Sequence, residues 1–80
     1  MIVQVERVVS VYEGECQPKY RYWHQFVSAD GAVYYLVGPQ PLELNPQQLL
    51  NIERYPQSWV RRYHDRWGLD EDSNYVKEIK

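Results

Sequence analysis

The chain has 80 residues, with nine lysines and arginines against eleven aspartates and glutamates, which gives a formal net charge of −2. A chain of this length is expected to form one domain, spanning residues 1–80, that buries roughly 60 to 65% of its unfolded surface and leaves little room for an elaborate active site. The net charge argues against whole-molecule attraction to nucleic acid or to anionic membranes. No membrane span or signal peptide is recognisable, and the single Cys16 favours a reducing compartment, so we expect a cytoplasmic protein.

The most unusual feature of the composition is its aromatic content. Eight tyrosines, three tryptophans and one phenylalanine make up 15% of the residues, more than one small core requires. These residues gather in two stretches that also carry arginine, 20–26 and 59–67. Tyrosine and tryptophan tolerate partial burial and are enriched at interfaces. The composition therefore favours a binding protein.

The first element in chain order is a predicted strand from Ile2 to Tyr12, where apolar and polar residues alternate. Arg7 interrupts the apolar face, so we expect a bulge or a sheet edge at that position. Residues 13–18 contain Gly14 and Pro18 among polar side chains, and this composition predicts a loop that includes Cys16.

A β-hairpin is predicted next, with strands at 20–28 and 32–38. Asp30 and Gly31 supply the two residues of positive φ that a tight hairpin turn requires. A two-residue loop would pair Phe26 with Tyr35 and Val27 with Tyr34. One face would then carry Tyr22, His24, Phe26, Tyr35 and Val37, and the other would carry Trp23, Gln25, Val27, Tyr34 and Leu36.

The second half of the chain predicts two short helices. The first is expected to begin at Pro46, with Asn45 as its N-cap and Gln48 completing a capping box, and to break before Pro56. The second is expected to restart near Ser58.

Trp59, Tyr63 and Trp67 recur every four residues in the second helix and predict its buried face. Gly68 is expected to end this helix in a left-handed conformation. Residues 75–79 alternate too weakly to choose between a terminal strand and a frayed tail. The elements together predict an α+β fold, in which an antiparallel sheet of three or four strands is followed by two short helices packed on one face.

No sequence motif places a nucleophile, a base and an orienting group together. Cys16, His24 and His64 could meet in space, but their spacing matches no ligand or catalytic pattern. His64 and Asp65 are neighbours on a helix, so we expect their side chains to diverge. The glycines are isolated and form no phosphate-binding loop. We therefore expect no catalytic residues, cofactor or metal, and we lean against an enzyme.

The expected function is that of a small non-enzymatic protein-binding module, an adaptor or inhibitor, that combines an aromatic hairpin with an arginine-bearing helix. Two alternatives stay open: single-stranded nucleic-acid binding, which the net acidity disfavours, and a homo-oligomer, such as a homodimer, that covers its open sheet face with its own copy. No membrane partner is expected. The expected partner-binding residues are Tyr20, Arg21, Tyr22, Trp23, Tyr34, Arg61, Arg62 and Arg66.

Overall fold

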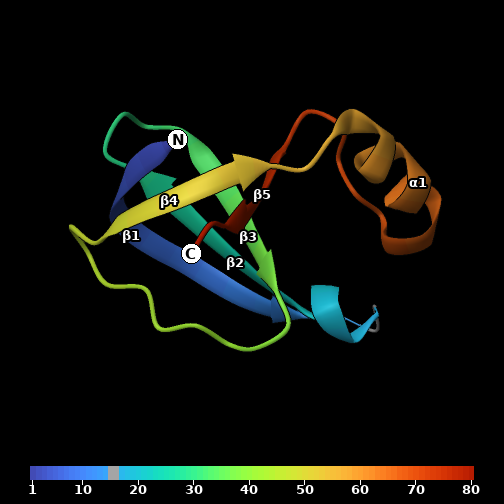
Figure 1. The fold of residues 1–80 in the computed structure, drawn as a ribbon, viewed down its shortest axis with the longest axis horizontal. Helices are drawn as coiled ribbons and strands as arrows, with labels where there is room; N and C mark the ends of the chain where they lie inside the picture. The colour runs from blue at the N-terminus through green and yellow to red at the C-terminus, as the bar shows by residue number, and fades with distance from the viewer. Residues whose placement is uncertain (15–16) are drawn as a thin grey trace.

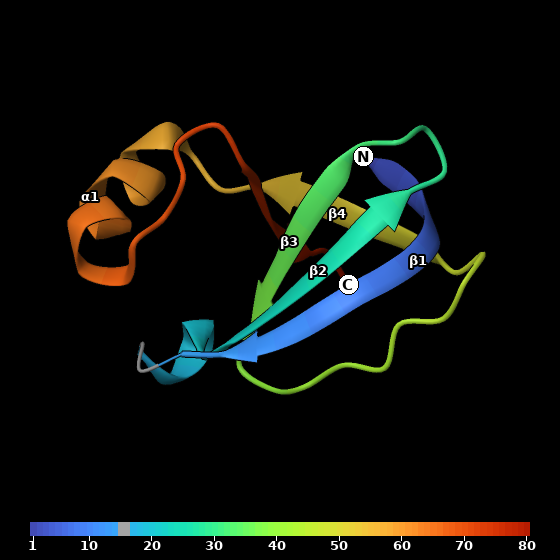
Figure 2. The ribbon, with the colours of Figure 1, turned by 180° about the vertical axis from the view of Figure 1, so that it is seen from behind.

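A computed structural model describes residues 1–14 and 17–80. These ranges contain β1 (Ile2–Glu13), a single 3-10 turn η1 (Pro18–Tyr20), β2 (Tyr22–Ser28), β3 (Val33–Gly38), β4 (Leu49–Arg54), α1 (Gln57–Trp67) and β5 (Asn74–Glu78). The strands close into a small barrel in the order β1-β2-β3-β5-β4. Figure 1 shows α1 at one end of the molecule, and Figure 2 shows β1, β2 and β3 side by side from behind.

The predicted fold class is wrong in the number and direction of its strands and in the number of its helices. The described residues form a five-stranded mixed sheet with one α-helix, because β5 inserts between β3 and β4 and runs parallel to β3. The weak alternation in β5 has a physical reason. Tyr75 and Val76 point to opposite faces and both are buried, so neither face of this strand is polar.

The helix predicted at Pro46 is instead a turn that leads into β4. The capping contact forms locally, because the Asn45 N–H donates to the Gln48 side chain at 3.0 Å. Gln47 then adopts a φ of 70°, which no α-helix contains. Its N–H donates to the Val5 carbonyl at 2.7 Å, so the chain turns onto β1 and does not wind into a helix.

β1 confirms the predicted first strand and extends it to Glu13. Its pairing with β2 shifts register between Val5 and Arg7 and again between Val8 and Ser10, as expected from the break at Arg7. The first half of β1 points valines into the barrel, whereas Val8 in the second half is 37% exposed. Of the loop predicted at 13–18, Glu13 belongs to β1 and Pro18 begins η1, while Cys16 lies outside the described residues.

The predicted hairpin forms, but its loop is one residue longer than expected. The Ser28 N–H donates to the Ala32 carbonyl at 2.8 Å, which leaves Ala29, Asp30 and Gly31 as the loop. The Asp30 carboxylate accepts hydrogen bonds from the Ser28 hydroxyl and the Ala32 N–H. Gly31 has a φ of 90°, the left-handed position of a three-residue hairpin loop.

The longer loop exchanges the two faces of β3. Phe26 pairs with Tyr34, not with Tyr35. A slip of one residue sends every side chain of a strand to the opposite face. Tyr34 therefore points into the barrel, where it is 4% exposed and stacks on Phe26, while Tyr35 points outward.

The buried residues form two cores. The barrel interior is mainly aliphatic and holds Val3, Val5, Phe26, Tyr34, Leu36, Leu50, Ile52 and Val76. A second core, here called the aromatic cluster, joins α1 to the outer face of the barrel. Its aromatic members are Tyr20, Trp23, Tyr35, Tyr55, Trp59, Tyr63, Trp67 and Tyr75.

The helix α1 confirms the predicted second helix and its aromatic stripe. Trp59 and Tyr63 are 9% and 7% exposed, and Trp67 is partly buried against them. Gly68 ends the helix with a φ of 67°, and its N–H donates to the His64 carbonyl at 3.0 Å. Across residues 1–14 and 17–80, no helix is long and apolar enough to cross a membrane.

Candidate functional site

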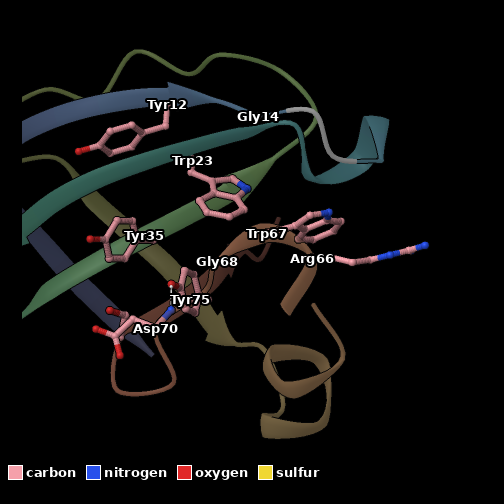
Figure 3. A pocket seen from close by; sticks show the side chains of 10 residues that line it. Tyr12, Gly14, Trp23, Tyr35, Arg66, Trp67, Gly68, Asp70 and Tyr75 are labelled. Carbon is pink, nitrogen blue, oxygen red and sulfur yellow. Dashed lines mark hydrogen bonds between the residues drawn. The ribbon is translucent and has the colours of Figure 1, made fainter. Parts of the chain in front are cut away.

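An open groove of about 510 Å³ lies on the outer face of the barrel, beside the C-terminal end of α1 (Figure 3). We call it the aromatic groove, because five of the side chains that line it are aromatic. These rings come from β1, β2, β3, the end of α1 and β5. They are Tyr12, Trp23, Tyr35, Trp67 and Tyr75.

Trp23 lies at the centre of the aromatic groove. Its ring centroid is 6.3 Å from that of Trp67 and 6.0 Å from that of Tyr75, in tilted and edge-on arrangements. The indole N–H donates to the Tyr20 carbonyl at 2.7 Å, which holds the ring in one orientation. Tyr35 stacks on Tyr75 at 5.3 Å. Because the rings hold one another, the groove is formed before any partner arrives.

Tyr12 forms the exposed rim of the groove. Its side chain is 48% exposed, and its hydroxyl donates to Gln25 at 3.2 Å across the neighbouring strand. Trp23, opposite Tyr12 in the ladder, lies deeper. A partner would therefore meet Tyr12 first and could pack against Trp23 below it.

The polar wall of the groove is organised around the turn between α1 and β5. The Tyr75 hydroxyl accepts a hydrogen bond from the Asp70 N–H at 2.9 Å. Burial raises the pKa of the Tyr75 phenol, so this group stays neutral at physiological pH. The Asp70 carboxylate in turn accepts from the Asp72 N–H at 3.0 Å. The turn therefore holds the exposed Asp70 beside the aromatic rings, with the exposed Arg66 on the helix side.

Two of the eight residues expected to bind a partner, Trp23 and Arg66, line the aromatic groove. Tyr34 lies inside the barrel. Arg61 is exposed on α1, and Arg62 lies with Ser58 and Trp59 at a separate hollow.

The three remaining expected residues precede the groove in the chain. Tyr20 is half-buried in the aromatic cluster, with its ring 5.3 Å from that of Trp59. Arg21 forms an exposed ion pair with Glu13, which raises the pKa of the guanidinium. Tyr22 is half-buried, and the Arg21 guanidinium lies 5.7 Å from its ring centroid.

Four rings of the groove escaped the sequence reasoning. The predicted two-residue loop places Tyr35 on the face opposite Trp23, whereas the observed three-residue loop places both rings on the outer face. Trp67 is predicted on the buried face of its helix, and it also lines the groove. Tyr12 lies on β1 and Tyr75 on β5, the first and the last strand in chain order. No local pattern in the sequence shows that these two residues meet in space.

The two histidines have different surroundings. His24 is fully buried, with Nδ1 2.9 Å from the Leu36 carbonyl and Nε2 2.8 Å from the Leu42 nitrogen. Because the Leu42 amide can only donate, Nε2 is the acceptor and Nδ1 carries the proton. His64 lies on the surface of α1.

The expectation that His64 and Asp65 diverge is wrong. Their side chains lie 3.2 Å apart, between His64 Nδ1 and an Asp65 carboxylate oxygen, on the exposed face of α1. Cys16 lies outside the described residues. Among the described side chains, no group of three or more His, Cys, Asp or Glu residues could hold a metal ion.

Comparisons with protein families, with curated protein sequences and with solved structures found no match to this chain. The fold and the groove define a class by architecture alone: a small five-stranded barrel whose single described helix helps to form an aromatic groove.

Proposed function

We propose that this protein is a non-enzymatic protein-binding module, an adaptor or inhibitor, whose aromatic groove receives an extended segment of a partner protein. The observation that carries this proposal is the open groove in which Tyr12, Trp23 and Trp67 are only partly covered by their own chain. Clustered aromatic residues are the anchors that dominate many protein interfaces. The proposal also includes a cytoplasmic setting, which rests on the single cysteine.

The shape and chemistry of the groove favour a proline-bearing segment. Grooves lined by aromatic rings bind polyproline II segments, whose extended backbone is ordered before binding and loses little entropy. Asp70 lines the groove beside the rings, and the exposed Glu71 and Asp72 follow it in the same turn. Charge complementarity therefore calls for a lysine or arginine next to the proline-bearing segment.

Single-stranded nucleic acid is the second candidate, supported by the position of the groove. In five-stranded barrels of the OB class, oligonucleotides bind over strands 2 and 3, between the loops that join strands 1 to 2 and 4 to 5. The aromatic groove occupies the corresponding place, over β2 and β3 and between Gly14 and the segment after α1. Bases could stack on Trp23, but the carboxylates of the turn would repel the phosphates. This support is an analogy with the architecture of OB-class barrels.

The decisive experiment compares the two ligand classes on one protein. Tryptophan fluorescence would be titrated with proline-rich peptides that carry a basic flank and with an oligothymidine, because Trp23 and Trp67 both line the groove. We expect the peptides to bind and Tyr12→Ala to weaken binding by roughly tenfold, the effect of one interface anchor at about 1.4 kcal/mol.

Tyr22→Ala is the matched control, because it removes a half-buried tyrosine of the neighbouring strand β2 that does not line the groove. It should leave peptide affinity within about twofold, since the truncated contact lies outside the interface. If only the oligothymidine binds, and its affinity falls steeply with added salt, the ligand of the groove is single-stranded nucleic acid and not a peptide. Peptide binding that ignores Tyr12→Ala would reject the groove as the site.

A further inference from the structure

The second half of β1, residues Arg7–Glu13, has a ladder partner on one side only. β2 follows β1 as far as Glu13. On the other side, β4 pairs only with Ile2–Gln4, and the connection between β3 and β4 bonds to the backbone of β1 only at Val5. In the part of the chain that the structure describes, one edge of Arg7–Glu13 therefore has no ladder hydrogen bonds. We call this stretch the β1 edge segment.

The composition of the β1 edge segment is unusual for an open edge. Val8, Val9 and Val11 are 37%, 45% and 48% exposed. No charged residue or proline lies between the two terminal residues of the segment. Proteins usually protect an open edge with charges or prolines, because a bare edge is a template for another strand.

We propose that two copies of this chain associate by pairing their β1 edge segments antiparallel, across a two-fold axis at Ser10. In this register Arg7 of each copy faces Glu13 of the partner subunit. Val8 and Val9 then face the partner's Tyr12 and the partner's Val11. The sequence Arg-Val-Val-Ser-Val-Tyr-Glu is self-complementary in this direction, with opposite charges at both ends and an apolar middle.

Charge selects the direction of pairing. A parallel arrangement of the same segments would place arginine opposite arginine and glutamate opposite glutamate. Arg7 makes no ion pair within the described residues. Glu13 contacts Arg21 of its own chain through Oε1 alone, which leaves Oε2 for the arginine of a second copy.

The register shift between Val8 and Ser10 lies close to the proposed axis. Bulges are one of the means by which proteins blunt an edge. The charges of Arg7 and Glu13 at the two ends of the segment therefore fix the proposed register. The inference does not rest on the proposed function, because it concerns the edge of β1 and not the ligand of the groove.

The experiment measures oligomeric state by light scattering across a dilution series, with circular dichroism as the check on folding. The wild-type chain is expected to dissociate from dimer to monomer on dilution. Arg7→Glu and Glu13→Arg each place like charges opposite each other at both ends, so each should weaken the dimer by about tenfold or more. The double variant restores opposite charges and should recover most of the lost affinity.

Arg54→Glu is the matched control, because it reverses an exposed arginine on β4, away from the segment. It should leave the dimer constant unchanged. A chain that stays monomeric at every concentration would overturn the inference, and so would a dimer that both single reversals leave intact. A dimer that weakens with Glu13→Arg but is not rescued in the double variant would overturn the register, since loss of the Arg21 contact would then explain the effect.

Discussion

At the scale of single residues, His24 carries the clearest structural role of any polar side chain. Its ring connects the Leu36 carbonyl in β3 to the Leu42 N–H in the long β3–β4 connection, from a fully buried position. A buried backbone group that loses its partner costs about 1 to 3 kcal/mol. We predict that His24→Leu, which leaves the Leu36 carbonyl and the Leu42 N–H without this hydrogen-bond partner, lowers the free energy of unfolding by roughly 2 to 4 kcal/mol in urea titrations.

His64→Leu is the matched control for this prediction, because the same substitution then falls on a side chain that is 47% exposed. The free energy of unfolding should stay within about 0.5 kcal/mol of wild type, as for most surface changes. Equal stability of the two variants would show that the pair of bonds at His24 adds nothing to the fold.

A single residue, Asp30, also explains why the sequence predicts the two faces of β3 the wrong way round. The alternation of β2 and β3 was readable, and so was the presence of a turn at Asp30 and Gly31. Whether the loop held two residues or three depended on the Asp30 carboxylate, which bonds to Ser28 and Ala32. That local choice exchanged Tyr34 for Tyr35 on the outer face.

At the scale of elements, local signals succeeded wherever tertiary pairing agreed with them. The aromatic stripe of α1 and its stop at Gly68 were predicted from periodicity and from the αL preference of glycine. The capping signals at Asn45 and Pro46 were equally strong, but they served a turn. Burial of Leu50 and Ile52 in the barrel interior stabilises the strand, whereas a short isolated helix is only marginally stable.

The end of α1 gives a prediction at this scale. Gly68 has a φ of 67° and open space where a Cβ would lie, so a substitution there costs backbone strain and no clash. Gly68→Ala should therefore lower the free energy of unfolding by roughly 1 kcal/mol. Gly38→Ala is the control, since that glycine has equal space and no positive φ, and thermal unfolding should show little change. Similar losses in both variants would argue against left-handed strain as the cause.

At the scale of the whole molecule, the aromatic content has a structural explanation that composition alone did not supply. Eight of the twelve aromatic residues belong to the cluster between α1 and the barrel. The interior of a five-stranded barrel is narrow, so a second core on its outer face adds buried area that the interior cannot hold. Burial in this cluster raises the pKa of Tyr55 to about 12. The groove lies at the edge of that second core, where some rings of the cluster are partly open to solvent.

The two cores are joined through neighbouring residues on the same strands, and this connection predicts how the molecule unfolds. In β5, Tyr75 belongs to the aromatic cluster and Val76 to the barrel interior. All three tryptophans lie in the cluster, so their fluorescence reports on α1 and its contacts, while far-ultraviolet circular dichroism also reports on the strands. A domain whose cores share strands should unfold as one unit.

Tyr63→Ala tests that cooperativity, because the Tyr63 ring stacks on Trp67 at 3.9 Å and has no contact with the barrel interior cluster. The truncation should cost roughly 3 kcal/mol, the usual loss for a buried aromatic side chain. If the cores unfold together, the fluorescence and dichroism midpoints shift by the same amount in urea. A fluorescence transition that precedes the dichroism transition would instead mean that α1 detaches from a barrel that stays folded. The aromatic groove would then open and close with the helix, because Arg66 and Trp67 form one of its walls.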